Sequence, residues 1–213
     1  MRRINMQTWS RRQHFEFFNT FDHPHFGMST NVDLSKLYPF MKGNGYSFNL
    51  GIIYLIACTA NEIPEFRYRL REGEVVEHEV VHPASTISSA EDLFNFCAFD
   101  YTEDFSTFEA RAKKQIAKTQ QETALQTKPG RDDLLYMSAI PWVSFTSFRH
   151  PMPYQPTDSM PRFAWGKFFN DDDRLLMPLD VQAHHALMDG FHIGKFFETI
   201  QEYLNHPVSV LGE

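Results

Sequence analysis

The chain has 213 residues, 42% of them hydrophobic and 22% charged, which is the composition of a folded protein with a substantial core. Its net charge of −7 argues against a nucleic-acid-binding surface, because contacts to phosphates need clustered lysine and arginine. The longest apolar run, GIIYLIACTA, is too short to span a bilayer, and the N-terminus lacks the apolar segment of a secretory signal. We therefore expect a cytoplasmic protein that binds neither nucleic acid nor membrane.

The aromatic and sulfur residues give two further expectations. The 21 phenylalanines indicate a core, and a pocket, built with aromatic rings. The two cysteines, Cys58 and Cys97, both lie among apolar residues, which favours thiols in a reducing compartment over a disulfide framework.

The first half of the chain predicts both helices and strands. Residues 9–18, WSRRQHFEFF, predict a helix capped by Ser10, and the alternating apolar residues of 26–34 predict a strand. Residues 49–60 predict a buried helix that ends near Pro64. Residues 66–81 then predict a hairpin that turns at Gly73.

The second half continues the mixture. The segment from Ala84 to Tyr101 gives no clear assignment, whereas 103–121 has the apolar spacing of a helix. Three segments have the pattern of strands: 132–145, 162–169 and 173–183. The last helix carries one apolar stripe, made of Ile193, Phe196, Phe197, Ile200 and Leu204. Without repeats or linkers, this order predicts a single α/β domain over residues 1–213.

Residues 181–192, VQAHHALMDGFH, gather the residue types of a reactive site. If a strand runs to the histidines, His184 and His185 point to opposite faces, which weakens a metal site that uses both. His185, Asp189 and His192 could meet around a metal after a turn, but their spacing matches no common zinc pattern, so we expect no metal. A general base needs one imidazole, and the alternative is that both rings only satisfy local backbone groups. The residues alone leave these two possibilities open.

A family resemblance extends over most of the chain. HHALMDGFH, followed by an amphipathic helix, resembles the HHxxxDG signature of chloramphenicol acetyltransferases, which also occurs in the acyltransferase core of 2-oxo acid dehydrogenase complexes. Four other segments resemble that family in the same order: WSRRQHFEFF, IIYLIA, SAIPWVSFTSF and DRLLMPLDVQ. The chloramphenicol enzymes are the nearer match, because the chain has no room for lipoyl modules. The resemblance implies a two-layer α+β sandwich in which a mixed sheet packs against helices.

The same resemblance implies a reaction and its residues. The family moves an acetyl group from acetyl-CoA directly to a hydroxyl of chloramphenicol, which blocks the action of the antibiotic and confers resistance. His185 matches the general base, and Ser138 matches the serine that donates a hydrogen bond to the tetrahedral oxyanion. Asp189 matches a structural aspartate whose ion-pair partner is Arg11.

The resemblance also implies a homotrimer with active sites between subunits. Matches to the acceptor pocket are Phe17, Phe18 and Phe148, beside which the following loop places His150. Trp142 and Phe168 match positions near CoA. Each of these aromatic residues has an alternative reading as ordinary core.

Two departures from the family pattern leave alternatives open. Ala164 stands where better-known members have a threonine that helps to hold a water near the oxyanion. The loop 149–161 hardly matches, and Arg149 and His150 bring polar groups to a wall that is usually less charged. The same chemistry on a different hydroxyl acceptor, or a catalytically silent CoA-binding homologue, therefore remains an alternative.

Overall fold

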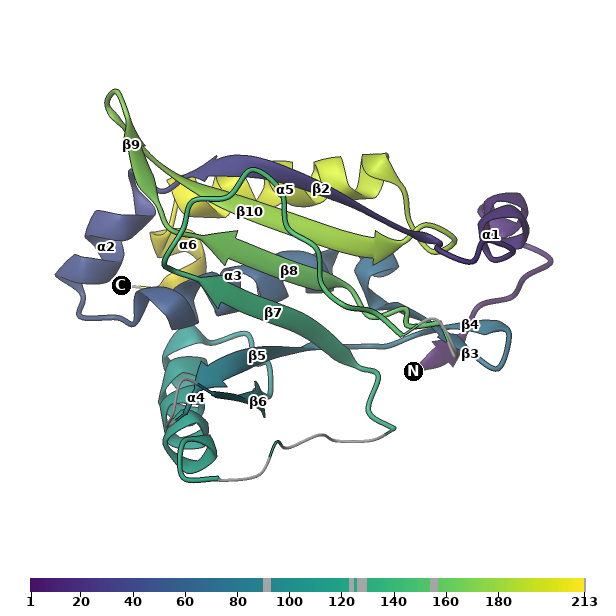
Figure 1. Cartoon of the computed structure of the whole chain (residues 1–213), viewed down its shortest axis with the longest axis horizontal. Coiled ribbons are helices and arrows are strands. Elements are labelled where there is room, and N and C mark those ends of the chain that lie inside the picture. The colour runs from purple at the N-terminus through teal and green to yellow at the C-terminus, as the bar shows by residue number, and fades with distance from the viewer. Residues whose placement is uncertain (90–92, 123–124, 126–129, 154–156, 213) are drawn as a thin grey trace.

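A computed structural model describes residues 1–213 except 90–92, 123–124, 126–129, 154–156 and 213. Its main element is a mixed sheet in the order β2, β10, β8, β7, β5, β6, with the short β9 paired to β10. The strands are β2 (His25–Asp33), β5 (His82–Ser88), β6 (Phe94–Ala98), β7 (Leu134–Ile140), β8 (Arg162–Gly166), β9 (Phe169–Asp171) and β10 (Arg174–His184). Helices cover one face of this sheet (Figure 1), so the expected two-layer α+β arrangement is confirmed.

The sheet combines both strand directions. β10 is antiparallel to both of its long neighbours, β2 and β8. β7 runs parallel to β8 and to β5, and β6 closes the edge antiparallel to β5. The connection from β7 to β8 passes over the sheet face turned away from the helices (Figure 1). A pocket lies between that connection and the sheet.

Three long helices pack against the other face. α3 (Phe48–Glu62) begins with a cap in which Ser47 accepts from the Leu50 amide. It is buried nearly all round, because it also contacts α4 (Phe105–Thr119) and α5 (Gly190–Asn205). Of the stripe predicted on the last helix, Ile193, Phe196, Ile200 and Leu204 are at most 1% exposed, and Phe197 is partly buried against the same core. Short helices complete the chain: α1 (Arg12–Phe18), α2 (Leu37–Gly43), η1 (Pro64–Arg67) and α6 (Val208–Leu211).

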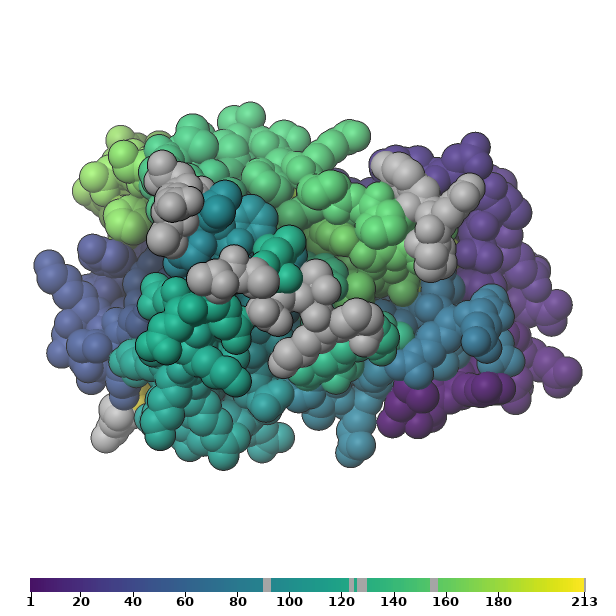
Figure 2. Space-filling model, turned by 60° about the horizontal axis from the view of Figure 1, so that its bottom comes forward, coloured from purple at the N-terminus to yellow at the C-terminus, as the bar shows by residue number. Residues whose placement is uncertain are grey.

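A second, smaller sheet lies beside the main one. It consists of β1 (Arg2–Arg3), β4 (Glu74–Glu77) and β3 (Tyr68–Arg71). Positive φ angles of 51° at Glu72 and 82° at Gly73 make the turn between β3 and β4, which confirms the predicted hairpin. The N-terminal segment with α1 lies at one end of the molecule and α2 at the other (Figures 1 and 2).

Ser10 was the wrong prediction for the cap of the first helix. α1 starts at Arg12, its N-cap is Arg11, and no side chain caps it. The chain before it turns on backbone hydrogen bonds, from the Trp9 amide to Asn5 and from the Arg12 amide to Trp9. Ser10 therefore lies within this turn.

The unassigned segment from Ala84 to Tyr101 contains most of β5 and all of β6. Its pattern was uninformative because β6 reverses the usual one: Phe94 and Phe96 are 50% and 39% exposed, while Asn95 is 4% exposed. Asn95 can be buried because its amide donates to the Glu122 carbonyl. Cys58 and Cys97, on α3 and β6, are not joined in a disulfide, as expected. Among the described residues, no helix is long and apolar enough to cross a membrane.

Candidate active site

The two adjacent histidines lie where β10 ends and have different surroundings. His184 is the last residue of the strand and is 2% exposed, and its Nδ1 accepts from the Ala186 amide. His185 is only partly buried, and its amide donates to the Pro24 carbonyl at 2.7 Å. Of the two rings, only that of His185 is therefore available to a bound molecule.

The His185 ring is held between aromatic rings and one backbone carbonyl. It stacks on the Phe18 ring, with the ring centroids 3.8 Å apart and the ring planes at 7°. The Phe26 ring is tilted relative to it, with its centroid 4.4 Å from that of His185. Its Nδ1 is 3.2 Å from the Met188 carbonyl oxygen. Because a carbonyl only accepts, Nδ1 carries the hydrogen, which leaves Nε2 with its lone pair free to take a proton.

Asp189 connects the turn that follows β10 and carries His185 to the N-terminal segment of the chain. Its Oδ2 accepts from Nη1 of Arg11 at 2.5 Å, and Nη2 of Arg11 reaches the His185 carbonyl at 3.4 Å. Asp189 is also the N-cap of α5, where it accepts from the Phe191 amide. The expected ion pair is therefore present, and it holds both ends of the turn that carries His185.

His192 and Glu65 extend this ion pair. The Asp189 amide donates to Nδ1 of His192, and Nε2 of His192 lies 3.5 Å from Glu65. Burial opposes the charge of His192, but the hydrogen bond and charge of Glu65, with the charge of Asp189, raise its pKa. Burial alone would raise the pKa of Asp189, but the hydrogen bond from Arg11 and the charge of His192 lower it. The sequence offered His192 only as a metal ligand, and nothing in the pattern pointed to Glu65.

Replacing Arg11 tests how strongly this network holds the fold. Arg11→Met leaves the Asp189 carboxylate without its main partner, and we expect the free energy of unfolding to fall by about 3 kcal/mol. That value is at the low end for a broken buried pair, because the Asp189 side chain is 32% exposed. Urea unfolding at a fixed protein concentration measures it. Arg12→Met, which removes an exposed pair with Glu16, is the matched control and should change stability by under about 1 kcal/mol.

Ser138 lies on the opposite sheet face from the helices, in a row that crosses four strands. Strand register places Ser138 beside Ala164, Ala164 beside Asp180, and Asp180 beside Ser29. Directly paired residues point to the same face of a sheet. Ser138 is therefore separated from Asp180 only by the methyl group of Ala164, which is 0% exposed.

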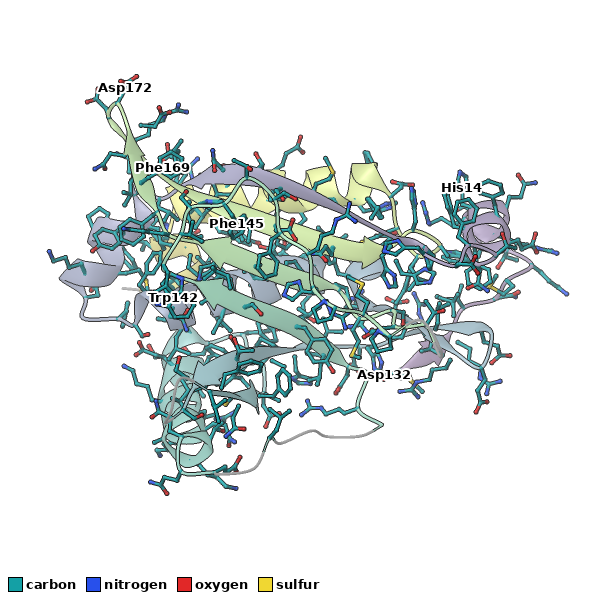
Figure 3. The ribbon with its side chains drawn as sticks, in the orientation of Figure 1. His14, Asp132, Trp142, Phe145, Phe169 and Asp172 are labelled. Atoms are coloured by element: carbon teal, nitrogen blue, oxygen red, sulfur yellow. The ribbon has the colours of Figure 1, made fainter. Side chains whose placement is uncertain are left out.

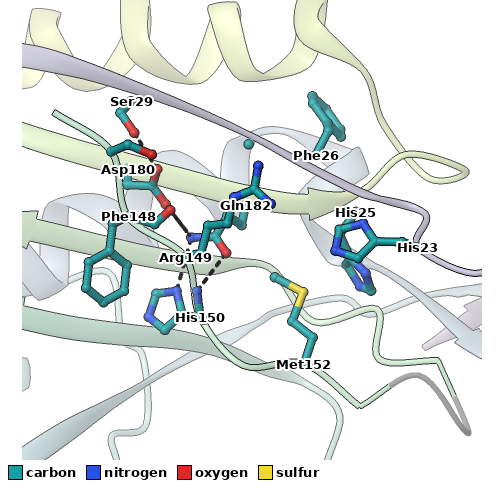
Figure 4. Close-up of a pocket in the computed structure, with 12 residues that line it drawn as sticks. His23, His25, Phe26, Ser29, Phe148, Arg149, His150, Met152, Asp180 and Gln182 are labelled. Atoms are coloured by element: carbon teal, nitrogen blue, oxygen red, sulfur yellow. Dashed lines mark hydrogen bonds between the residues drawn. The ribbon is translucent and has the colours of Figure 1, made fainter.

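A pocket lies over this row, between the sheet and the connection from β7 to β8 (Figure 4). The sheet contributes Ser29, Asp180 and Gln182, and the connection contributes Phe148 and His150. Nε2 of His150 is 3.3 Å from the Ser138 hydroxyl oxygen. The remaining lining residues are His23, His25, Phe26, Gly27, Ser147, Arg149 and Met152. The structure thus brings Phe148, His150 and Ser138 together, whereas residues 154–156 of the 149–161 loop lie outside the described residues.

A buried histidine, His184, and a half-buried one, His150, give the stability of the fold a dependence on acid pH. Burial, and then the charges of His25 and His185, lower the pKa of His184 to about 3. Burial and the charge of Arg162 lower the pKa of His150 to about 4. Both rings are therefore neutral in the folded chain well below the usual value of 6.5.

Their titration predicts a loss of stability as the pH falls below 6.5. In that range the unfolded chain binds protons that the folded chain does not, so the stabilisation present above pH 6.5 is lost towards the folded pKa values. His184→Asn keeps an acceptor for the Ala186 amide but does not titrate. We expect it to reduce the loss between pH 6.5 and 4 by up to about 3 kcal/mol. Urea unfolding over this pH range measures the slope, and an unchanged slope would show that His184 is protonated in the folded chain.

The aromatic residues expected near CoA lie at the end of the molecule away from α1. Trp142 is 77% exposed just beyond β7, far from His14 on α1 (Figure 3). The Lys167 amide donates to the Val143 carbonyl, which places Trp142 beside the segment of Phe168. Phe168 itself packs on Tyr38 and Phe48 and is partly buried.

The expected site residues form two groups within one chain. Phe18, His185, Asp189 and Arg11 make the first group, with Phe17 60% exposed at its edge. Ser138, Phe148 and His150 make the second, and among the described residues no hydrogen bond joins the two groups. The described part of the chain also holds no cluster of three or more His, Cys, Asp or Glu side chains placed to bind a metal.

Comparison with known proteins identifies the family of the chain. The family model described as chloramphenicol acetyltransferase matches residues 1–201. A chloramphenicol acetyltransferase of Proteus mirabilis is 34% identical over 94% of this chain and 93% of its own length. A chloramphenicol acetyltransferase 2 of Escherichia coli is 33% identical over 93% of this chain and 94% of its own.

Solved structures give the same picture of the fold. A chloramphenicol acetyltransferase superposes with a TM-score of 0.87 at 29% identity, covering 96% of this chain and 100% of that one. The dihydrolipoamide acetyltransferase of Azotobacter vinelandii shares the fold, with a TM-score of 0.68 at 17% identity over 93% and 88% of the two chains. By sequence and by structure, the chain is an acyltransferase that belongs to the chloramphenicol acetyltransferase family.

Proposed function

We propose that this chain, as a single domain over residues 1–213, transfers the acetyl group of acetyl-CoA to a hydroxyl of chloramphenicol. The observation that carries the proposal is the 3.2 Å contact between Nδ1 of His185 and the Met188 carbonyl oxygen, from which we infer the tautomer of the ring. With its Nδ1 hydrogen donated to the Met188 carbonyl, Nε2 has a lone pair for the proton of an acceptor hydroxyl. The names of the family and its relatives give chloramphenicol as the acceptor and acetyl as the transferred group, and we propose acetyl-CoA as the donor.

In the proposed reaction, His185 takes the proton of the acceptor hydroxyl and Ser138 stabilises the negative charge that develops on the carbonyl oxygen. Acetyl-CoA supplies the acetyl group as a thioester. His185 removes the proton of the acceptor hydroxyl as its oxygen bonds to the thioester carbon, and the carbonyl oxygen becomes an oxyanion. The Ser138 hydroxyl donates to that oxyanion. When the carbon–sulfur bond breaks, the proton on His185 passes to the sulfur, giving free CoA thiol and the acetyl ester without an acyl-enzyme.

Formation of this site between two subunits explains the separation of the two groups. We propose a homotrimer in which His185 of one subunit faces Ser138 of its neighbour. The exposed rings of Phe94 and Phe96 on the edge strand β6 support association, because such apolar groups gain by being covered. Light scattering should then give three times the chain mass of 24.9 kDa.

The substrates would occupy two different surfaces. We propose that Phe17, Phe18, Phe148 and His150 bound the acceptor, with Phe148 and His150 on the wall of the pocket beside Ser138. Trp142, whose indole is largely exposed, and Phe168 would contact CoA. With no membrane-crossing helix among the described residues, we propose that the enzyme works in the cytoplasm, where acetyl-CoA is made, and protects its host from chloramphenicol.

Thiol release tests the proposal directly. Purified protein with acetyl-CoA should release CoA thiol only when chloramphenicol is added, and the product should be its acetyl ester by mass spectrometry. Arg149, His150 and Asp180 give the acceptor pocket polar walls, so other hydroxyl compounds form the comparison panel. Thiol release with one of these and none with chloramphenicol would keep the chemistry but overturn the acceptor. If no acceptor in the panel caused thiol release, the result would favour a homologue that binds CoA but has no turnover.

A further inference from the structure

His150 has hydrogen-bond partners that a residue of the pocket wall does not need. Nε2 of its ring is 3.3 Å from the Ser138 hydroxyl oxygen, and its Nδ1 is 3.2 Å from Nε2 of Gln182. Figure 4 shows His150 and Gln182 side by side, with Asp180 beyond them. The position of the hydrogen on the His150 ring decides whether the Ser138 hydroxyl donates its own hydrogen to His150 or accepts one from it.

The orientation of the Gln182 amide is fixed by its surroundings. Its Oε1 accepts from the His150 amide at 3.0 Å, and its Nε2 faces Asp180 Oδ2 at 2.5 Å and the Phe148 carbonyl at 3.3 Å. Carboxylate and carbonyl oxygens only accept, so exchanging the two ends of the amide would place like groups against each other. Gln182 and Asp180 are 5% and 2% exposed, so water does not replace these partners.

The chain around this pair keeps it in place. Asp180 also accepts from the Ser29 hydroxyl at 2.6 Å. On β2, Gly27 lies opposite Gln182, and a Cβ there would come within 2.9 Å of the Gln182 side chain. The absence of a side chain at Gly27 therefore leaves the space that Gln182 occupies.

The amide orientation determines the tautomer of His150. Nε2 of Gln182 shares its two hydrogens among Asp180, the Phe148 carbonyl and Nδ1 of His150. Nδ1 therefore accepts, and the single hydrogen of the neutral ring is on Nε2, from which it is donated to Ser138. The lowered pKa of His150, caused by burial and by Arg162, keeps the ring neutral near pH 7.

The consequence for Ser138 concerns its own hydrogen. A hydroxyl has one hydrogen and two lone pairs. If His150 had the other tautomer, Ser138 would donate to its Nε2 and have nothing left for an oxyanion. With Nε2–H as donor, Ser138 accepts from His150 and its hydrogen points elsewhere. Ala164, between Ser138 and Asp180 in the strand register, offers no competing acceptor.

We propose that His150 is a positioning residue, which donates to Ser138 and so reserves the Ser138 hydrogen for the oxyanion, with Gln182 and Asp180 fixing its tautomer. This assignment rests on the proposed function, because it assumes that Ser138 is the oxyanion donor. It gives His150 a second role besides bounding the acceptor, since this effect on the reaction runs through Ser138.

Two substitutions at His150 test the assignment by kinetics. His150→Leu removes the donor, and kcat for chloramphenicol acetylation should fall about tenfold, with KM values within about twofold. His150→Gln places an amide donor near the position of Nε2 and should recover kcat to within about threefold of the native value. A rise in KM for chloramphenicol without a fall in kcat would make His150 a simple wall residue and overturn the proposal.

A double-mutant cycle separates action through Ser138 from a structural role. In a Ser138→Ala background, His150→Leu should reduce kcat by less than about twofold, because the group that it positions is already gone. An equal tenfold loss in both backgrounds would contradict the proposal. Phe148→Leu is the matched control, since it changes the same pocket wall and should act equally in both backgrounds.

A spectroscopic test does not depend on turnover. In protein labelled with ¹⁵N-histidine, the His150 ring should show the Nε2–H tautomer from pH 8 to 5, with Nδ1 unprotonated. Gln182→Leu should remove this preference. The Nδ1–H tautomer in the native protein would overturn the proposal. If native protein does not acetylate chloramphenicol, the proposed function fails, while the tautomer still decides whether this hydrogen-bond chain exists.

Discussion

His185→Ala should abolish most of the acetylation of chloramphenicol. The substitution removes the only group that we assign to take the proton of the acceptor hydroxyl, and a positioned base contributes roughly a hundredfold to ten-thousandfold. We expect kcat to fall by about a thousandfold at pH 7.5, with little change in the binding of acetyl-CoA. Initial rates of thiol release measure the fall.

The control for this substitution is another histidine of the same chain. His206 directly follows α5 and is exposed, and among the described residues its hydrogen bonds and ion pair are to Glu202 and Ser209. His206→Ala should therefore retain native activity. Activity of His185→Ala within tenfold of the native rate would mean that another group is the base. Since His185 stacks on Phe18, circular dichroism of the variant should accompany the rates, to show that the loss does not come from unfolding.

Ser138→Ala should give the second largest loss. Removing one donor from an oxyanion site costs roughly a hundredfold to a thousandfold in turnover, and we expect kcat to fall by about a hundredfold with KM nearly unchanged. The loss should not come from packing, because alanine lacks only the hydroxyl of serine and position 138 is partly exposed. Ser209→Ala, at an exposed serine near the C-terminus, is the control.

A different result would identify a different role for Ser138. If Ser138→Ala raised KM for chloramphenicol tenfold and left kcat alone, the hydroxyl would bind the acceptor in its ground state instead of the transition state. Ser138→Thr keeps a hydroxyl and should recover part of the rate.

Much of the fold could be predicted because its apolar patterns follow ordinary periods. The stripe on α5 depends on burial on one side, which the sequence records directly. The strands do so less, because β10 is buried on both faces and Met28, on the predicted inner face of β2, is 43% exposed. β6 could not be predicted, because Phe94 and Phe96 point outward and Asn95 points inward. That inversion is stabilised by a hydrogen bond to the distant Glu122, which no local pattern contains.

The sequence likewise identified some residues of the candidate site and missed others. The HHxxxDG signature identified His185 and Asp189, and the Arg11–Asp189 pair followed from the family resemblance and is present. The tautomer of His185 depends on the carbonyl of Met188, and backbone groups leave no trace in side-chain patterns. The sequence pattern identified Gln182 and Asp180 only as strand residues. The hydrogen bond between Gln182 and His150 joins positions 32 apart in the sequence, which no local pattern reveals. Only the folded chain brings the β7–β8 connection over β10.

We propose that His185 of one subunit and Ser138 of its neighbour form one active site, and mixed trimers test this most directly. His185→Ala and Ser138→Ala chains, each nearly inactive alone, would be unfolded together, refolded at equal amounts, and assayed for acetylation of chloramphenicol. Random assembly gives an intact pair at about a quarter of the interfaces. We therefore predict recovery to about a quarter of the native rate. Activity no higher than the average of the two separate variants would contradict the account, because a site within one chain cannot be restored by mixing.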